Sequence, residues 1–98
     1  MSNNLGVATA IYTDQEYTRV IYHNTPVVSF NQEKIILDSD YWWTNTTKKR
    51  MNQLSDMFNL GFYVHQKNGQ WYVDYQDKTY EFDMNGVNHN PTLTLSRI

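Results

Sequence analysis

Residues 62–75 decide the fold, and they read Phe-Tyr-Val-His-Gln-Lys-Asn-Gly-Gln-Trp-Tyr-Val-Asp-Tyr. Two β-rich runs flank Asn68-Gly69, a dipeptide that suits a type I′ turn because both central residues of that turn need φ > 0. A two-residue loop also fixes the register of the hairpin. The sequence therefore predicts paired strands over 62–67 and 70–75, with His65 opposite Tyr72 and Val64 opposite Val73.

Alternation along this hairpin separates an apolar face from a polar face. The apolar face, which we assign to the core, holds Phe62, Val64, Trp71, Val73 and Tyr75. A second tight turn at Asp77-Lys78 would add a third strand, with Tyr80 opposite Tyr75 and Phe82 opposite Val73. Both aromatic side chains would then lie on the same apolar face, so the hairpin extends into a three-stranded meander.

An amphipathic helix is predicted over residues 46–59, directly before the hairpin. Its apolar stripe has the spacing i, i+3, i+7 and consists of Met51, Leu54 and Phe58, with Met57 beside them. Each of residues 44–46 can cap the helix N-terminus through a side-chain oxygen. Gly61 is placed where a left-handed residue would end the helix.

The N-terminal half is rich in β-forming residues. Strands are expected at residues 7–12, 17–23, 27–30 and 34–37, and the alternating run 92–96 could add an edge strand. The predicted class is α+β: an antiparallel sheet of N-terminal strands plus the C-terminal meander, with one amphipathic helix packed on one face. Residues 1–98 form a single domain, with 1–5 and 84–98 as possible loose termini.

Composition excludes several classes of protein. The chain has 98 residues, no Cys and a net charge of −2, which is unlike a dedicated, strongly basic nucleic-acid binder but allows a local basic patch. No signal peptide and no apolar run of about 20 residues is present, so we expect no membrane association and a cytoplasmic protein. No catalytic motif, phosphate loop or metal-ligand spacing is found. We therefore expect no enzymatic activity, no metal and no cofactor.

One cluster breaks a local rule of helix stability. Lys48, Lys49 and Arg50 would lie in the first turn of the helix, where the helix dipole is already positive. Cations and threonine hydroxyls at a helix N-terminus suit an anion, and aromatic side chains just upstream could stack on bases. The candidate binding residues are Trp42, Trp43, Thr46, Thr47, Lys48, Lys49 and Arg50.

A structural explanation of the same cluster stands beside the functional one. Asp38 and Asp40 could neutralise the cations, and the Trp42-Trp43 pair could fill the core under the helix. Surface charges usually serve solubility and buried tryptophan is common, so general experience favours this structural interpretation.

The outer face of the meander carries a second candidate cluster. With the predicted register, His65, Tyr72 and Asp83 form one cross-strand row, and Tyr63, Asp74 and Glu81 form the next. Facing carboxylates repel each other and can mark a cation site or a shifted pKa. A solvated polar sheet face is the more common meaning of such rows. His23 and His89 stand alone and are expected in loops.

Three segments together resemble a group of short proteins of tailed bacteriophages. They are residues 22–30, 46–53 and 62–73, and the resemblance spans about residues 17–75. It implies a phage origin and a location in the cytoplasm of the bacterial host, and it brings no known activity. The relatives would be expected to carry Gly near Ser39-Asp40, whereas this chain carries a bulkier acidic residue there.

The function we expect is that of a non-enzymatic phage accessory protein that acts by binding. The partner is either nucleic acid or a host protein, for example a component of host or defence machinery. The alternatives are a small enzyme or metal-binding protein that uses the sheet face of His65, Asp74, Glu81 and Asp83, and a minor component of the virion.

Overall fold

The computed structural model describes residues 9–84 and 90–98. The expected start of the first strand at residue 7, the loose end at 1–5 and His89 lie outside these residues, as does most of the segment 85–90 that precedes the last strand.

The predicted α+β class is confirmed, with eight strands and one helix in the described residues. The elements are β1 (Thr9–Thr13), β2 (Thr18–Tyr22), β3 (Thr25–Phe30), β4 (Lys34–Asp38), α1 (Asn45–Met57), β5 (Phe62–Lys67), β6 (Gln70–Tyr75), β7 (Lys78–Glu81) and β8 (Thr92–Ser96). β3 begins two residues before the expected start and includes Pro26, next to a register shift between Val20 and Ile21 of β2. An irregularity of this kind accommodates the missing N–H of proline.

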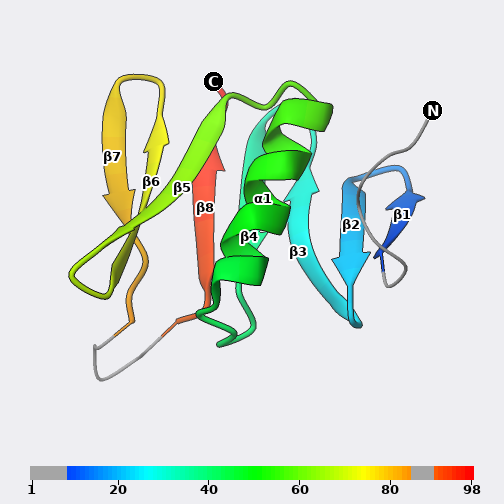
Figure 1. Ribbon diagram of the computed structural model, residues 1–98. Coiled ribbons are helices and arrows are strands. Elements are labelled where there is room, and N and C mark those ends of the chain that lie inside the picture. Colours follow the sequence, from blue (N-terminus) through cyan, green and yellow to red (C-terminus); the bar gives the residue numbers. More distant parts are fainter. Residues whose placement is uncertain (1–8, 85–89) are drawn as a thin grey trace.

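The strands form two antiparallel sheets rather than one. The order is β1-β2-β3-β4-β8 in the first sheet and β5-β6-β7 in the second. The alternating run 92–96 is therefore an edge strand and not a loose terminus, and it pairs with β4 through Leu37 opposite Leu93. Figure 1 shows β8 on the side of the large sheet that lies toward β5 and β6.

The register of the β5–β6 hairpin is confirmed at every predicted pair, including His65 opposite Tyr72 and Val64 opposite Val73. The second turn was misplaced by one residue. The residues with positive φ are Gln76 and Asp77, so Tyr80 lies opposite Val73 rather than opposite Tyr75. Because the pairing moves by two residues, the apolar face is preserved.

Helix α1 has well-defined ends. Thr44 is the N-cap, and its Oγ1 accepts a hydrogen bond from the Thr47 backbone N–H at 3.2 Å. At the other end Leu60 N–H donates to the Ser55 carbonyl, and Asn59 has φ 57°. This is a Schellman cap with Asn59 at its left-handed position, so Gly61, which also has positive φ, is not the terminating residue. Within the described residues, α1 included, no helix has the length and apolar character to cross a bilayer.

One hydrophobic core joins both sheets and the helix. Met51 and Leu54 of α1 are fully buried in it, together with the five predicted core residues of the hairpin. Phe58 is half-buried and packs on Phe30 of β3, with ring centroids 5.1 Å apart. Met57, expected beside the stripe, is 40% exposed. The helix thus packs against β3 as well as β5.

Side chains of α1 occupy the free edge of β5. Asn52 Oδ1 accepts from the Val64 N–H at 2.7 Å, and Asn52 Nδ2 donates to the Val64 carbonyl at 2.9 Å. The Ser55 hydroxyl donates to the Phe62 carbonyl at 2.7 Å and accepts from the Phe62 N–H at 3.0 Å. The helix therefore supplies the hydrogen bonds that a neighbouring strand would otherwise make, which closes an exposed edge.

Candidate binding site

The three cations of the sequence-predicted cluster point in different directions. The helix begins at Asn45, so they occupy its second turn and not its first, and the Lys48 N–H already donates to the Thr44 carbonyl. Lys48 Nζ donates to Gln66 Oε1 at 2.7 Å and lies 5.6 Å from the centre of the Trp71 ring. Arg50 lies on the other side, with its guanidinium 4.8 Å from the Tyr22 ring centre, and Lys49 is exposed.

The two tryptophans of the cluster also separate. The Trp43 ring meets the rings of Trp71 and Phe82 edge-to-face, with centroids 5.0 and 5.4 Å apart, and belongs to the core. Trp42 is 65% exposed. The structural interpretation, in which the pair fills the core, is therefore correct for Trp43 and wrong for Trp42.

Trp42 borders a pocket of about 390 Å³ at the N-terminal end of α1, which we call the Trp42 pocket. Three parts of the chain build it: the β2–β3 hairpin, the loop between β4 and α1, and the first turn of the helix. Its lining consists of Tyr22, His23, Thr25, Val27, Ser39, Trp42, Thr44, Thr46 and Thr47. Three of the sequence-predicted binding residues, Trp42, Thr46 and Thr47, are thus brought together.

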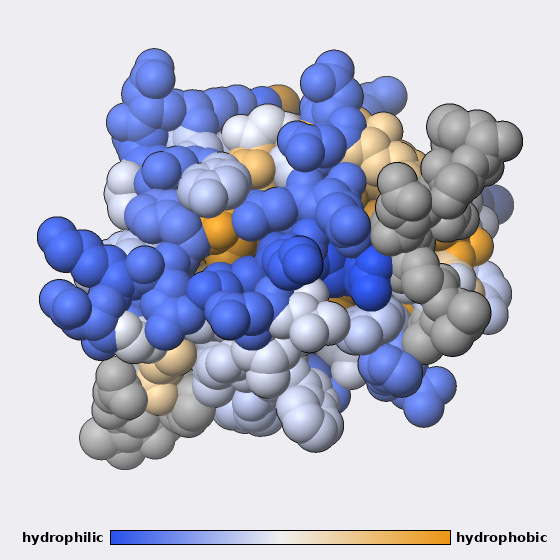
Figure 2. All heavy atoms as spheres, viewed as in Figure 1, coloured by the Kyte–Doolittle hydropathy of each residue, from blue (hydrophilic) through white to orange (hydrophobic). Residues whose placement is uncertain are grey.

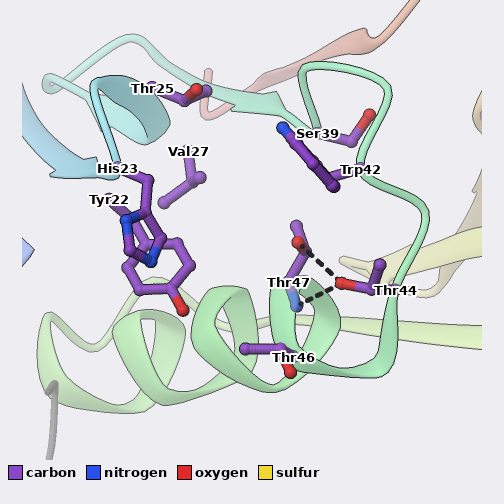
Figure 3. A pocket seen from close by; sticks show the side chains of 9 residues that line it. All are labelled: Tyr22, His23, Thr25, Val27, Ser39, Trp42, Thr44, Thr46 and Thr47. Carbon is purple, nitrogen blue, oxygen red and sulfur yellow. Dashed lines mark hydrogen bonds between the residues drawn. The ribbon is translucent and has the colours of Figure 1, made fainter. Parts of the chain in front are cut away.

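Aromatic rings form opposite walls of the Trp42 pocket. Figure 3 shows Trp42 on one side and His23 with Tyr22 on the other, with Val27 between them. The rings of Tyr22 and His23 contact each other at an angle of 61°, with centroids 4.3 Å apart. Figure 2 shows hydrophilic side chains over the outer face of α1 and paler ones of intermediate hydropathy at the bottom of the view, where the loop before the helix lies.

Several polar groups of the pocket are available to a ligand. Among the hydrogen bonds of residues 9–84 and 90–98, none uses the Tyr22 hydroxyl, the His23 imidazole, the Trp42 indole N–H or the Thr46 hydroxyl. The lining has no Lys, Arg, Asp or Glu side chain. It therefore offers neutral donors and acceptors between aromatic walls.

The position of Trp42 is fixed by a hydrogen-bonded turn. The Trp42 N–H donates to the Ser39 carbonyl at 2.8 Å, and Asp40 and Tyr41 at the centre of the turn have φ values of 50° and 65°. Thr25 Oγ1 donates to Asp40 Oδ2 at 2.9 Å, which ties the turn to β3. Aspartate tolerates left-handed backbone, so Asp40 fills a position where the phage resemblance led us to expect glycine.

The second candidate cluster, on the outer face of the small sheet, has a different geometry from the prediction. Glu81, not Asp83, lies in the row of Tyr72, and Thr79 lies opposite Asp74. The predicted facing of Asp74 and Glu81 is thus wrong, because the β6–β7 turn lies one residue earlier.

The groups of this outer face are partnered with each other. His65 Nε2 and Asp74 Oδ1 are 3.0 Å apart, and the same carboxylate oxygen accepts from the Thr79 hydroxyl at 2.8 Å. The His65 bond and then the Thr79 bond hold the pKa of Asp74 below its usual value. The His65 ring is stacked between Tyr63 and Tyr72. No three His, Asp or Glu side chains of the described residues converge on a possible metal position.

Comparison with models of known protein families gives a match over most of the chain. Residues 2–90 match the model of the family described as Kyanoviridae Gp96 protein. The chain belongs to this family. The Kyanoviridae are tailed phages of cyanobacteria, so the phage origin implied by the resemblance is confirmed. No curated protein and no solved structure matches the chain.

In this Kyanoviridae Gp96 chain, sequence reasoning missed one wall of the Trp42 pocket. Tyr22 and His23 belong to the β2–β3 hairpin, whose two-residue turn has positive φ at His23 and Asn24. The dipeptide His-Asn between two β-rich runs was the available signal, because Asn and His tolerate left-handed backbone better than most residues. The His23-Asn24 dipeptide is distant in sequence from Trp42, so no local pattern indicates that the two belong to one site.

Asp38→Asn should leave the melting midpoint at neutral pH unchanged or raised. Partial burial raises the pKa of Asp38, and the nearby Asp40 charge adds to this, while the hydrogen bond from the Asp40 N–H to Oδ1 opposes it. A raised carboxyl pKa means that the ionised form destabilises the fold at neutral pH, and that protonation relieves this on acidification. An amide keeps the acceptor oxygen without the charge.

The measurement is thermal melting of wild type and variant over a pH series from neutral to acid. We expect any advantage of the variant at neutral pH to disappear as the pH falls through the pKa of Asp38. A variant less stable than wild type at neutral pH would mean that the Asp38 charge supports the turn that holds Trp42.

Proposed function

We propose that this protein is a non-enzymatic phage accessory protein that acts in the cytoplasm of its host by binding a partner at the Trp42 pocket. The observation that carries the proposal is the exposed Trp42 ring, which a hydrogen-bonded turn holds opposite Tyr22 and His23. An exposed tryptophan contributes nothing to the core, whereas tryptophan and tyrosine are the most frequent anchors of binding surfaces.

The rigidity of the pocket supports the proposal. Four short hydrogen bonds define the loop before α1: Trp42 N–H to Ser39 O at 2.8 Å, Thr44 N–H to Trp42 O at 2.9 Å, Asp40 N–H to Asp38 Oδ1 at 2.8 Å, and Thr25 Oγ1 to Asp40 Oδ2 at 2.9 Å. A backbone held in this way has little conformational entropy left to lose when a ligand contacts the loop, so more of the contact energy appears as affinity.

The enzymatic alternative has less support from the geometry. It would use His65 and the carboxylates of the outer sheet face, yet His65 is already paired with Asp74 and stacked between two tyrosines. This network has the character of a structured sheet surface. In the Trp42 pocket, by contrast, the Tyr22 and Thr46 hydroxyls, the His23 imidazole and the Trp42 indole N–H make no hydrogen bond within the described residues.

A host protein is a second candidate partner, and Tyr41 favours it. Tyr41 is 54% exposed and adjacent to Trp42, so the loop presents two neighbouring aromatic side chains. The net charge of −2 is also compatible with a protein partner. Nucleic acid is the first candidate because of the chemistry of the pocket itself.

The proposal is tested by capture from lysate of the cyanobacterial host with the tagged protein as bait. Three baits are compared: wild type, Trp42→Ala, and Tyr63→Ala as the matched control. Tyr63 is 57% exposed on the outer face of the small sheet, so its removal alters surface aromatic area away from the pocket. Each bait is used with nuclease-treated and untreated lysate, and bound protein and nucleic acid are both quantified.

We expect wild type and Tyr63→Ala to retain the same component and Trp42→Ala to lose it. Loss of that component on nuclease treatment identifies nucleic acid, and retention identifies a host protein. Equal capture by all three baits would show that the Trp42 pocket is not the binding surface, and the proposal would then be wrong.

A further inference from the structure

We infer that the Trp42 pocket receives one unstacked base of a single-stranded nucleic acid, with the sugar-phosphate backbone running along α1 past Lys49. The inference rests on the proposed function, because it names the ligand of the same pocket. Four features carry it: the aromatic walls, the size, the neutral polar lining and the placement of the nearby charges.

The walls and the size of the pocket fit a planar ring. Trp42 and the Tyr22–His23 pair face each other across a volume of about 390 Å³, with the methyl groups of Val27 between them. This volume is at the lower end of the roughly 300–1,000 Å³ found for small-ligand pockets. It accommodates one base rather than an extended oligonucleotide, and aromatic side chains are the usual platforms on which unpaired bases stack.

The polar groups of the pocket match the edge of a base. The Trp42 indole N–H is a donor, while the Thr46 and Tyr22 hydroxyls and the His23 imidazole can donate and accept. A nucleobase carries donors and acceptors side by side on its edge and has no charge, which suits a lining that has no charged side chain. A phosphate or a carboxylate in the same place would lack a cationic partner.

The charged side chains around the pocket determine on which side the sugar-phosphate backbone of the nucleic acid leaves it. Thr46 lines the pocket, and Lys49 and Arg50 follow it by three and four residues, so both neighbour Thr46 on the surface of the helix. Lys49 itself lines the hollow between α1 and β5. On the opposite side, Asp40 accepts the hydrogen bond of Thr25. Phosphates are attracted to the helix side and repelled from the loop side, so the chain leaves the pocket along α1.

The two cations near the pocket have different parts in this arrangement. Arg50 is held against the Tyr22 ring and donates to Gln53 Oε1 at 3.0 Å, so it supports the wall of the pocket. Lys49 is exposed at the side of α1 that faces β5, so it would contact a phosphate only after the strand has crossed the helix from the pocket. Lys48, which is engaged with Gln66 on the far side of the helix, takes no part.

Duplex nucleic acid does not fit the pocket. Every base of a duplex is paired and stacked, so its planar faces are not accessible to Trp42. A base must first leave the stack, and unstacking and unpairing it costs free energy that a single strand does not have to supply. Single strands are therefore the expected ligand, of either DNA or RNA.

The test uses short fluorescently labelled oligonucleotides of mixed sequence and measures anisotropy at several salt concentrations. Four probes are compared: single-stranded DNA, single-stranded RNA, the DNA duplex, and an abasic DNA strand with the same number of phosphates. The variants are Trp42→Ala, Trp42→Phe and Lys49→Gln, with Tyr63→Ala and Lys78→Gln as matched controls on the small sheet. Trp42 and Lys49 are exposed, so these variants should retain the melting midpoint of wild type.

We expect wild type to bind a single strand of DNA or RNA, and Trp42→Ala to weaken this binding by about 5-fold to 150-fold. Trp42→Phe should retain most of the affinity. Lys49→Gln should reduce the slope of log affinity against log salt by about 0.7, the value for one phosphate contact with a single strand. The two control variants should bind as wild type does, and the abasic strand should be insensitive to Trp42→Ala.

Equal affinity of wild type for the abasic and the normal strand, or for the duplex and the single strand, would overturn the inference. So would the absence of binding to every probe at low salt. If that absence is found while the capture experiment still depends on Trp42 in nuclease-treated lysate, the proposed function stands with a protein partner. If capture is also independent of Trp42, both the inference and the proposed function are wrong.

Discussion

Trp71→Ala should lower the free energy of unfolding by about 3–5 kcal/mol, the range for deleting a large aromatic side chain from a core. Trp71 is 1% exposed, and its ring contacts Trp43 and Phe82, with centroids 5.0 and 5.9 Å apart. Its removal therefore leaves a cavity in the core between the small sheet and the loop before α1. Against a typical domain stability of about 5–15 kcal/mol, this loss is large enough to unfold a marginal protein.

Tyr72→Ala is the matched control, because Tyr72 is the next residue of β6 and points to the other face. It is half-buried and stacks on His65, with ring centroids 5.6 Å apart. We expect a loss of about 1 kcal/mol, of the size of one cross-strand pair. The free energy of unfolding of both variants is measured by denaturant melts that are analysed with a common m-value. Equal losses would contradict the assignment of the two faces of the hairpin.

Asn52→Ala should lower the free energy of unfolding by about 2–4 kcal/mol. The side-chain amide of Asn52 makes both hydrogen bonds of Val64, at 2.7 and 2.9 Å, and Val64 is buried. Without it, one N–H and one carbonyl at the edge of β5 lose their partners. Each buried group left unpaired costs about 1–3 kcal/mol, and partial access of water at the half-buried Asn52 position limits the sum.

Two further variants isolate this effect. Asn52→Asp keeps an acceptor for the Val64 N–H but places a carboxylate beside the Val64 carbonyl, so it should be destabilising as well. Gln53→Ala removes an amide from the next position of the helix, where its Oε1 accepts a hydrogen bond from Arg50, and should cost about 1 kcal/mol or less. Wild-type stability of Asn52→Ala would show that water replaces the side chain at this edge without cost.

Local patterns predicted the parts of the fold whose partners are close in sequence. Asn68-Gly69 defined the register of β5 and β6, and the i, i+3, i+7 spacing of Met51, Leu54 and Phe58 identified the core side of α1. The turn at Gln76-Asp77 was placed one residue too late, because Asp77 was assigned to the first rather than the second left-handed position. Turn propensities indicate which residue types form a turn, but they do not locate the turn to within one residue.

The parts that depend on distant contacts could not be predicted in the same way. No local signal indicates that residues 92–96 pair with β4, or that the meander forms a sheet of its own. The site has the same limitation. Trp42 and Trp43 are neighbours in sequence, yet the Asp40-Tyr41 turn directs one outward and the other into the core, and the opposite wall of the pocket comes from the β2–β3 hairpin.

The pairing of β4 with β8 also has a consequence during synthesis. The small sheet and α1 are encoded between these two strands, so the ribosome makes them before β8. Synthesis proceeds at about 5–20 residues per second, so one edge of β4 remains unpaired for seconds. During this time the contiguous segment from α1 to β7 can already form its local contacts. This unpaired edge is the place where two nascent chains can pair with each other. Packing of α1 onto β3 can form before β8 is made, whereas the edge of β4 is covered only when β8 pairs with it.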